Sequence, residues 1–362
     1  MNPFRYQRAD SVAVALSAIQ AGLGDAPPDA APPRFLAGGT NLIDLMKENI
    51  ARPAALVDIR HLPLREIAPQ PDGSLHLGAL ATNADTAEHP LVRANYPLLR
   101  SAILAGASPQ IRNMATNGGN LLQRTRCYYF YDAGVPCNKR LPGSGCPAAE
   151  GLARQHAILG ASPQCIATHP SDMCVALAAL DAQVHLASPR GTRAIAFGEL
   201  HRLPGDRPEL DTTLADDELI THLTLPPPRF QRHSSYLKIR ERASYAFALV
   251  SVAAALDLAE DGTVREARIA LGGVAHKPWR DPQAEALLAG RPAGSQAYAE
   301  AAAFLLREAR AWGGPALPES LPGNAFKIPL AQRAIVRALE MAAAGVPSNT
   351  GVDACRTPEI QA

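Results

Sequence analysis

The sequence predicts an α+β protein of two domains. Its 362 residues suit two domains, or three, at the usual domain size. Segments with strand-like alternation and segments with helical apolar spacing both occur along the chain. Three consecutive prolines, residues 226–228, directly follow a strand-like segment and form the best candidate for a domain boundary, because proline ends regular structure.

Composition and charge exclude several classes of protein. Apolar residues make up 47% and charged residues 19%, which is typical of a globular chain and not of a disordered one. The 35 Lys and Arg against 34 Asp and Glu give no electrostatic case for nucleic acid or an anionic membrane. We therefore expect no nucleic-acid binding and no membrane insertion. The N-terminal residues lack the unbroken apolar core of a secretory signal, so we expect no signal peptide of its own.

The first elements form a small β-α-β unit. The polar pair 10–11 caps a predicted helix over 12–21. An apolar strand over 34–37 ends in a glycine turn, after which helical spacing resumes at Leu42. A second strand over 55–59 completes the unit.

Further elements follow from apolar periodicity. Strands are predicted over residues 74–79, 183–187, 219–225, 235–240 and 264–271. Helices are predicted over residues 96–105, 173–180, 281–288, 297–312 and 330–344. The tail from Val346 is rich in Pro, Ser and Thr, and we expect it to be flexible.

Two polar glycine segments could bind a phosphate. Gly38 and Gly39 lie between a strand and a helix, where backbone N–H groups can approach an anion. The segment 107–123 contains a second glycine pair, Gly118–Gly119, among short hydrogen-bonding side chains. Together they suit a long ligand with a pyrophosphate. The alternatives are an ordinary strand-to-helix turn for the first segment and a surface hairpin for the second.

The cysteines indicate a metal site. Four of the six fall within 39 residues, with the spacing C-x9-C-x8-C-x18-C: Cys127, Cys137, Cys146 and Cys165. The closely spaced pairs typical of structural zinc are absent from this set. Four thiolates on an irregular, glycine-rich loop favour a cubane iron–sulfur cluster, with zinc and free or disulfide-bonded thiols as alternatives.

The sequence predicts structural roles for the other cysteines, histidines and aromatic residues of this region. Cys174 lies in an apolar helix and is predicted to be a core thiol, and Cys355 in the tail is assigned no role. His156 and His169 are expected to make hydrogen bonds within the cysteine loop. The aromatic segment 128–131 is expected to be its main apolar anchor.

Four segments carry a resemblance to a known family: residues 35–47, 108–121, 169–172 and 237–256. They resemble, in the same order, the FAD-binding subunits of molybdenum hydroxylases, the group of xanthine dehydrogenase, carbon monoxide dehydrogenase and aldehyde oxidoreductase. The resemblance implies a two-lobed vanillyl-alcohol-oxidase-like (PCMH-type) FAD-binding domain over 1–228, with lobes of about 1–60 and 61–228. A C-terminal α+β domain of antiparallel strands and helices follows over 229–345, and a flexible tail over 346–362.

The resemblance also implies the FAD-binding residues. The first glycine loop would hold the pyrophosphate with Leu36, Ala37, Gly38, Gly39, Thr40, Asn41 and Leu42. The remaining contacts would come from Thr116, Gly119, Asn120, Asp172, Ile220 and Lys238, the last of these near the flavin ring. The chain departs from the family at Tyr245–Ala246, where Asp-Ile is frequent, and this puts the shape of the ring pocket in doubt.

The cysteine loop, residues 124–169, resembles an insertion in the FAD subunit of periplasmic aldehyde oxidoreductase, which holds an additional 4Fe-4S cluster. The resemblance implies that Cys127, Cys137, Cys146 and Cys165 ligate such a cluster. The FAD subunit of 4-hydroxybenzoyl-CoA reductase also carries a cluster, with different cysteine spacing.

The function implied is electron transfer in a molybdenum-dependent aldehyde oxidoreductase. Electrons would come from a molybdenum-cofactor large subunit through a 2Fe-2S small subunit of a heterotrimer, reach FAD here and leave to an external acceptor. No catalytic residue is assigned, and the chain alone is expected to be inactive on aldehydes. Location in the periplasm would follow from co-export with a signal-bearing partner, with the cytoplasm as the alternative.

Three other functions remain open. The chain could be the flavin subunit of a complex like xanthine dehydrogenase or 4-hydroxybenzoyl-CoA reductase. It could also be a self-sufficient FAD oxidase of the same fold, although the cluster loop would then have no evident electron donor. A non-redox scaffold stapled by a metal, with glycine loops that are merely turns, is the non-enzymatic alternative.

Overall fold

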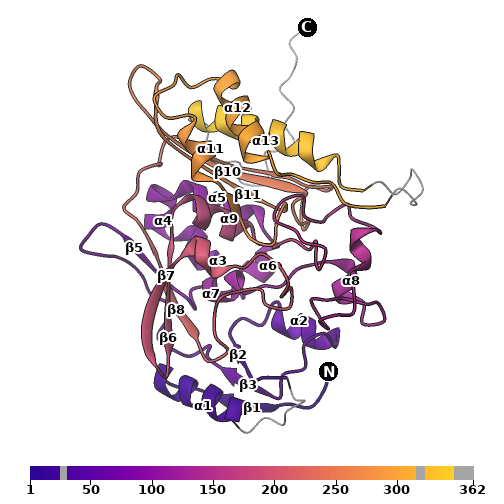
Figure 1. Ribbon diagram of the computed structural model, residues 1–362. Helices are drawn as coiled ribbons and strands as arrows, with labels where there is room; N and C mark the ends of the chain where they lie inside the picture. The colour runs from indigo at the N-terminus through magenta and orange to yellow at the C-terminus, as the bar shows by residue number, and fades with distance from the viewer. Residues whose placement is uncertain (25–30, 315–322, 346–362) are drawn as a thin grey trace.

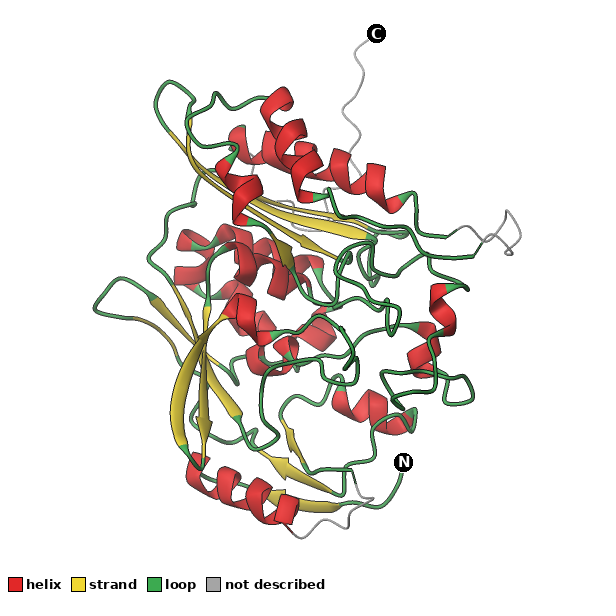
Figure 2. Cartoon of the chain, in the orientation of Figure 1, coloured by secondary structure: helices red, strands yellow, loops and turns green. Residues whose placement is uncertain are grey.

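Three β-sheets and the helices packed on them make up the computed structural model, which describes residues 1–24, 31–314 and 323–345 (Figure 1). Helices and strands both contribute extensively, and the predicted α+β class is confirmed (Figure 2). The tail that was expected to be flexible, including Cys355, lies outside the described residues.

The N-terminal sheet has three parallel strands in the order β1-β3-β2, with helices α1 and α2 beside it. Their bounds are Arg5–Arg8 (β1), Val12–Gly24 (α1), Arg34–Leu36 (β2), Leu42–Lys47 (α2) and Ala55–Asp58 (β3). The predicted β-α-β unit is confirmed by β2, α2 and β3. Strand β1 was not predicted, because all four of its residues are exposed and no apolar alternation marks it.

A five-stranded antiparallel sheet follows, in the order β4-β5-β8-β6-β7. The strands are Ile67–Pro69 (β4), Leu75–Gly78 (β5), Gln183–Ser188 (β6), Gly191–Ala196 (β7) and Leu219–Leu225 (β8). Apolar side chains of this sheet share one core with two helices, Pro97–Ala105 (α5) and Asp172–Ala179 (α9). Cys174 of α9 is fully buried in this core, which confirms its prediction as a core thiol.

The C-terminal sheet is antiparallel, in the order β12-β11-β10-β9. Its strands are Ser234–Ile239 (β9), Val250–Leu258 (β10), Val264–Gly272 (β11) and Trp279–Arg280 (β12). The helices Ser295–Leu305 (α12) and Lys327–Ala343 (α13) cover one face, and α5 and α9 lie against the other (Figure 1). Residues of β10 therefore enter two cores. This central strand was not predicted, and its residues from Val252 to Leu256 are all apolar instead of alternating with polar ones.

The shorter elements occupy the connections between the sheets. They are Asn83–Glu88 (α3), Pro90–Asn95 (α4), Pro109–Arg112 (α6), Asn117–Leu121 (α7), Tyr128–Tyr131 (α8), Pro147–Ala149 (η1), Phe197–Leu200 (α10) and Pro282–Ala286 (α11). The segment 107–123 forms the helices α6 and α7, so its alternative interpretation as a surface hairpin is wrong.

Two predicted helices are shorter than expected. The helix predicted over 297–312 ends at Leu305, because the chain then turns and the Arg310 N–H donates to the Ile158 carbonyl of the cysteine loop. The helix predicted over 281–288 spans only α11, with Asp281 as its N-cap.

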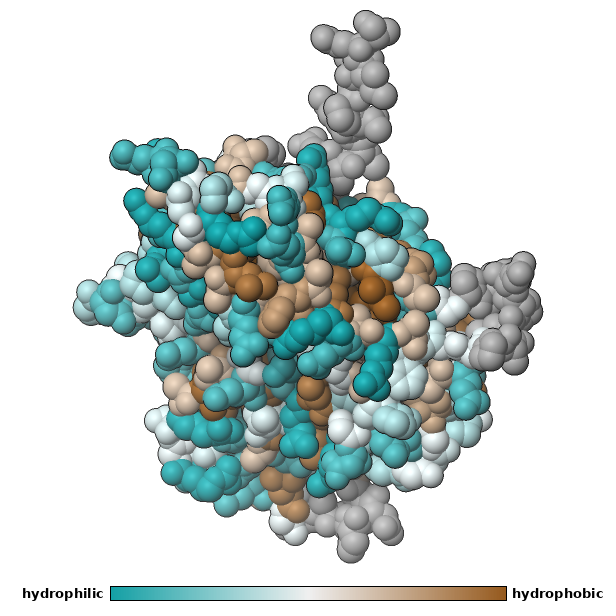
Figure 3. Space-filling model, turned by 45° about the horizontal axis from the view of Figure 1, so that its top comes forward, coloured by the Kyte–Doolittle hydropathy of each residue, from teal (hydrophilic) through white to brown (hydrophobic). Residues whose placement is uncertain are grey.

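The surface gives no sign of a membrane span. Hydrophilic side chains are interspersed with smaller apolar groups over the face that Figure 3 shows. Among the described residues, no helix has both the length and the apolar character needed to cross a bilayer.

Candidate flavin and metal sites

A cleft of about 580 Å³ lies where the first glycine loop, α7, α9 and β9 meet. This volume falls in the usual range for small-molecule and cofactor sites. Six predicted FAD-binding residues line it: Thr40, Asn41, Gly119, Asn120, Asp172 and Lys238. Residues from the N-terminal half of the chain and from the C-terminal sheet thus contribute to a single cleft.

The other predicted FAD residues are not among those that line this cleft. Leu36 and Leu42 pack in a small apolar cluster with Met46, and Ile220 is buried in the core, beside Gly118. Thr116 accepts the Gly119 N–H as the N-cap of α7. The set Leu36, Ala37, Gly38, Gly39, Leu42, Thr116 and Ile220 therefore lies outside the cleft lining.

The first glycine loop needs both of its glycines. Gly39 has a φ of +74°, a conformation that L side chains rarely adopt. A Cβ at Gly38 would lie 1.8 Å from the Met114 carbonyl oxygen, so only glycine lets the two glycine segments meet. Asn41 accepts the Arg124 N–H, while its buried Nδ2 has no partner among the described residues and is available to a ligand.

The second glycine segment differs from the first in its backbone conformation. Gly118 and Gly119 both lie in α7, and neither has a positive φ. Gly118 instead permits close packing against Ala79, since a Cβ there would lie 3.1 Å from the Ala79 Cβ. Asn120 donates from Nδ2 to the Asn83 Oδ1 at 2.7 Å, a contact that sequence reasoning missed.

A buried ion pair joins α9 to the C-terminal sheet at the cleft wall. Lys238 donates to Asp172 Oδ2 at 2.8 Å and to the Ala105 carbonyl at 3.0 Å. The two side chains are only 4% and 8% exposed. Tyr236 donates its hydroxyl to Asp172 Oδ1 at 2.7 Å, and burial raises the pKa of this tyrosine well above its ordinary value. Tyr236 was not predicted, because its neighbours in sequence give no sign of the contact with α9.

The segment that departs from the family lies at the cleft. Tyr245 lines it with a positive φ of 51° and a side chain that is 58% exposed. Arg242 donates to the Tyr245 carbonyl and lies over its ring, 5.8 Å from the centroid. This part of the cleft wall is therefore aromatic and positively charged.

We expect Gly39→Val to abolish FAD binding. The substitution forces a β-branched residue into a left-handed conformation, and its Cβ would lie 2.6 Å from the Ile43 Cδ1. The flavin-to-protein ratio of the purified variant, measured by absorbance, checks this. Gly24→Val is the control, because a Cβ at this glycine meets no atom within 4 Å. Stoichiometric flavin in Gly39→Val would contradict the pyrophosphate assignment.

The four clustered cysteines line one cavity. Cys127, Cys137, Cys146 and Cys165 all contribute to it, and all are free thiols. The disulfide alternative is therefore not realised in the described residues. Their convergence from sequence positions far apart provides the ligand set that a four-iron cubane requires, one thiolate for each iron.

Hydrogen bonds shape the first half of the cysteine loop. Cys137 donates its N–H to Ser144 Oγ at 3.0 Å, and Gly145 donates its N–H to Asn138 Oδ1 at 2.7 Å. Arg140 donates to the carbonyls of α8, whose Phe130 is fully buried. The predicted aromatic anchor is thus supplied mainly by Phe130.

The second half of the loop has apolar anchors that were not predicted. Ile158 and Leu159 are buried in the core formed with the C-terminal sheet, and Ile166 in a cluster with Trp312. The expectation of few apolar anchors beyond residues 128–131 is wrong, because apolar residues without periodic spacing were not counted. This half of the loop is held by packing as well as by any metal.

Charges around the cysteine cavity are arranged in two groups. Lys139 lines the cavity and donates to Asp211 Oδ1 at 2.6 Å, and Arg124 also pairs with Asp211. Burial would raise the pKa of the Asp211 carboxyl, but these two cations hold it well below its usual range. On another side, His156 Nε2 lies 3.1 Å from Cys127 Sγ, and burial lowers the pKa of His156 to about 4.

The thiols themselves differ in acidity. Burial raises the pKa of Cys127 to about 12, whereas the contact with Cys165 lowers the pKa of Cys146 to about 6. A metal must displace the protons from such buried thiols, so binding is expected to be favoured by raised pH. The free sulfurs and the nearby donors fit an iron–sulfur cluster.

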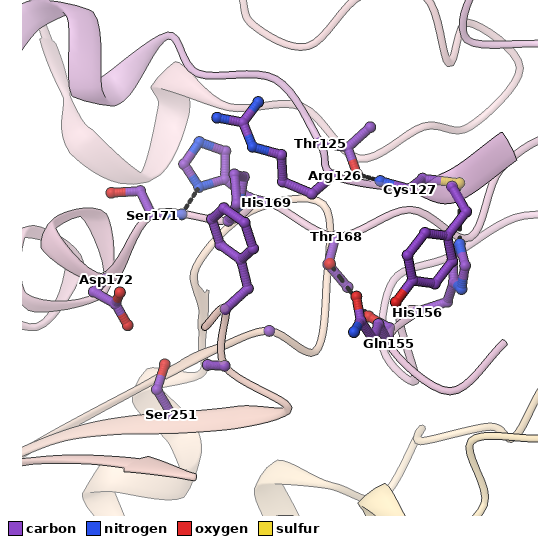
Figure 4. A pocket seen from close by; sticks show the side chains of 15 residues that line it. Thr125, Arg126, Cys127, Gln155, His156, Thr168, His169, Ser171, Asp172 and Ser251 are labelled. Carbon is purple, nitrogen blue, oxygen red and sulfur yellow. Dashed lines mark hydrogen bonds between the residues drawn. The ribbon is translucent and has the colours of Figure 1, made fainter. Parts of the chain in front are cut away.

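A small internal pocket lies between the two sites. Ser171 and Asp172, which also line the large cleft, are at one side, and Cys127 and His156 are at the other (Figure 4). His169 was expected to make hydrogen bonds in the loop. It accepts the Ser171 N–H and contacts the Leu121 carbonyl at 3.4 Å, so its ring makes these contacts just outside the loop and not within it.

Comparison with protein families gives two matches in chain order. Residues 2–228 match the FAD binding domain in molybdopterin dehydrogenase. Residues 235–317 match the CO dehydrogenase flavoprotein C-terminal domain. The two matches meet close to the triple proline and together span most of the chain.

Individual proteins are similar over most of their length. The FAD-binding subunit of an aldehyde oxidoreductase from Escherichia coli is 52% identical, over 80% of this chain and 86% of that protein. The FAD subunit of nicotinate dehydrogenase from Eubacterium barkeri is 26% identical over 72% and 73%. A solved structure of CO dehydrogenase from Oligotropha carboxidovorans shares the fold, with a TM-score of 0.72, 24% identity, and coverage of 95% of this chain and 99% of that one.

Proposed function

The chain belongs to the FAD-binding subunits of the molybdenum hydroxylase family, and we propose that it transfers electrons through FAD and a 4Fe-4S cluster in an aldehyde oxidoreductase. The observation that carries this proposal is the convergence of four free cysteines on one cavity, separated from the flavin cleft by a single small pocket. The 52% identity to an aldehyde oxidoreductase subunit supports the same substrate class for the complex.

The protein's part in this function is to bind and tune its cofactors. FAD supplies the ability to accept electrons and pass them on, and the protein supplies binding, orientation and electrostatics. The first glycine loop and Asn120 would hold the pyrophosphate, and the Asp172–Lys238 pair would face the flavin. The four cysteines would each ligate one iron.

The proposed assembly is a heterotrimer with a molybdenum-cofactor large subunit and a 2Fe-2S small subunit. Electrons would arrive from the small subunit and leave to an external acceptor, and the chain alone would not oxidise aldehydes. The FAD-binding domain would comprise 1–228 and the C-terminal domain 229–345. Co-export with a signal-bearing partner would place the complex in the periplasm, with the cytoplasm as the alternative.

A second candidate is the flavin subunit of another molybdenum hydroxylase. The nicotinate dehydrogenase FAD subunit and a xanthine dehydrogenase FAD-binding subunit of Escherichia coli, at 26% and 28% identity, favour it less than the aldehyde oxidoreductase relative does. Aldehyde and purine substrates offered to the complete complex distinguish the two, with the reduction of an artificial acceptor as the measurement.

Absorbance and metal analysis of the purified complex and of this chain test the cofactors. We expect flavin bands, a broad iron–sulfur shoulder, and iron with acid-labile sulfide in this chain. Flavin without iron would limit the proposal to a flavin subunit, and zinc in place of iron would contradict the cluster. Zinc without flavin would favour the non-redox scaffold stapled by a metal.

A further inference from the structure

A buried lysine contacts the backbone of His156, the histidine whose ring lies beside Cys127. Lys327, the first residue of α13, is fully buried, and its Nζ donates to the His156 carbonyl at 2.8 Å and the Gly273 carbonyl at 2.5 Å. No carboxylate in the described part of the chain pairs with it, and burial lowers the pKa of Lys327 to about 7. Buried charges are normally paired, because removing an ion from water is costly. The charged form of Lys327 therefore needs a negative group nearby.

His156 links this lysine to the proposed cluster. The His156 side chain contacts Cys127 Sγ through Nε2 at 3.1 Å, while its buried Nδ1 has no partner within the described ranges. A thiolate ligand can only accept a hydrogen bond, so the proton belongs on Nε2. Asn324 donates to the carbonyls of His156 and Ala157, so residues beside and within α13 clamp the backbone that carries this imidazole.

The other buried lysine near the cavity is already compensated. Lys139 lines the cavity, but its ammonium donates a hydrogen bond to the Asp211 carboxylate and forms an ion pair with it. Lys327 has only carbonyl oxygens as acceptors. A cubane cluster held by four thiolates is anionic, and its negative charge grows when it is reduced. The side chain of His156 thus contacts Cys127, and Lys327 contacts the backbone of the same histidine. An anionic cluster held by Cys127 would favour the charged form of Lys327.

We propose that His156 and Lys327 are positioning residues that raise the reduction potential of the 4Fe-4S cluster. His156 donates a hydrogen bond to the sulfur of Cys127, and Lys327 holds the His156 backbone and offsets the negative charge of the cluster. Both interactions favour the reduced, more negative form, as hydrogen bonds and charge near a cluster generally do. The inference rests on the proposed function, because it requires that the cysteines hold a cluster.

A redox titration followed by low-temperature EPR tests this in the purified, cofactor-loaded complex. The variants are His156→Phe, which removes the donor and keeps a ring, and Lys327→Met, which removes the charge and keeps the chain length. Lys327→Arg retains the charge. Lys277→Met is the matched control, because Lys277 also donates to a backbone carbonyl, that of Gly198, which lies outside the cysteine loop.

We expect a lower cluster midpoint potential in His156→Phe and Lys327→Met, a smaller shift in Lys327→Arg, and none in Lys277→Met. Iron content at the wild-type level with an unchanged potential in His156→Phe, or in folded Lys327→Met, overturns the inference. If Lys327→Met does not fold, the midpoint potential of His156→Phe alone tests the inference. A wild-type protein without iron instead refutes the proposed cluster, so the two failures are distinguishable.

Discussion

Replacing Cys127, Cys137, Cys146 or Cys165 singly with serine is expected to remove most of the iron and acid-labile sulfide from this chain. All four sulfurs line one cavity, and a cubane cluster needs a ligand on each iron, so three thiolates retain it poorly. Iron and sulfide assays on each purified variant measure the loss.

Cys174→Ser is the matched control. Cys174 is fully buried in the core under the five-stranded sheet and contributes nothing to the cysteine cavity, so its replacement should leave the iron content unchanged. An equal loss of iron in Cys174→Ser, or zinc in the wild-type protein, would contradict the assignment of the four ligands.

Loss of the cluster should also expose part of the loop to protease. We expect cleavage to concentrate between Asp132 and Cys146, where hydrogen bonds within the loop hold the backbone. The part from Ile158 to Ile166 should stay protected, because its apolar side chains are buried in two cores. Mass analysis of the fragments from limited proteolysis distinguishes this pattern from unfolding of the whole loop.

Lys238→Met is expected to lower both the stability of the protein and the reduction potential of its flavin. The substitution leaves the Asp172 carboxylate buried without its cation, and breaking a buried ion pair costs about 3–5 kcal/mol. A cation beside the cleft also favours the anionic reduced flavin, so its removal should lower the midpoint potential. Denaturant unfolding and a flavin redox titration measure the two effects.

A double-mutant cycle with Asp172→Asn isolates the contribution of the pair. The double variant should lose less stability than the sum of the losses in the two single variants, since the two residues are in direct contact. Lys47→Met serves as a control at an exposed lysine. An unchanged flavin potential in Lys238→Met would show that the lysine has only a structural role.

Sequence patterns were sufficient to predict a residue's role where that role depends on its neighbours in the sequence. The first glycine loop was predicted because a strand, two glycines and a helix follow one another within a few residues, and Gly39 indeed has a left-handed backbone. The second segment was predicted less well: Gly118 and Gly119 lie in α7, and Gly118 is required for packing on Ala79 rather than for a positive φ.

The sequence by itself determined the α+β class, the β-α-β unit and the family, and it predicted the residues of the proposed cluster, because periodicity and motif spacing are properties of neighbouring residues. Only the tertiary structure decided which residues meet across long separations. Asp172 and Lys238, 66 positions apart, form one buried pair. Lys327 donates a hydrogen bond to the carbonyl of His156, 171 positions away. Such contacts leave no trace in local spacing, since they arise when packing of the apolar cores brings α9, β9 and α13 together.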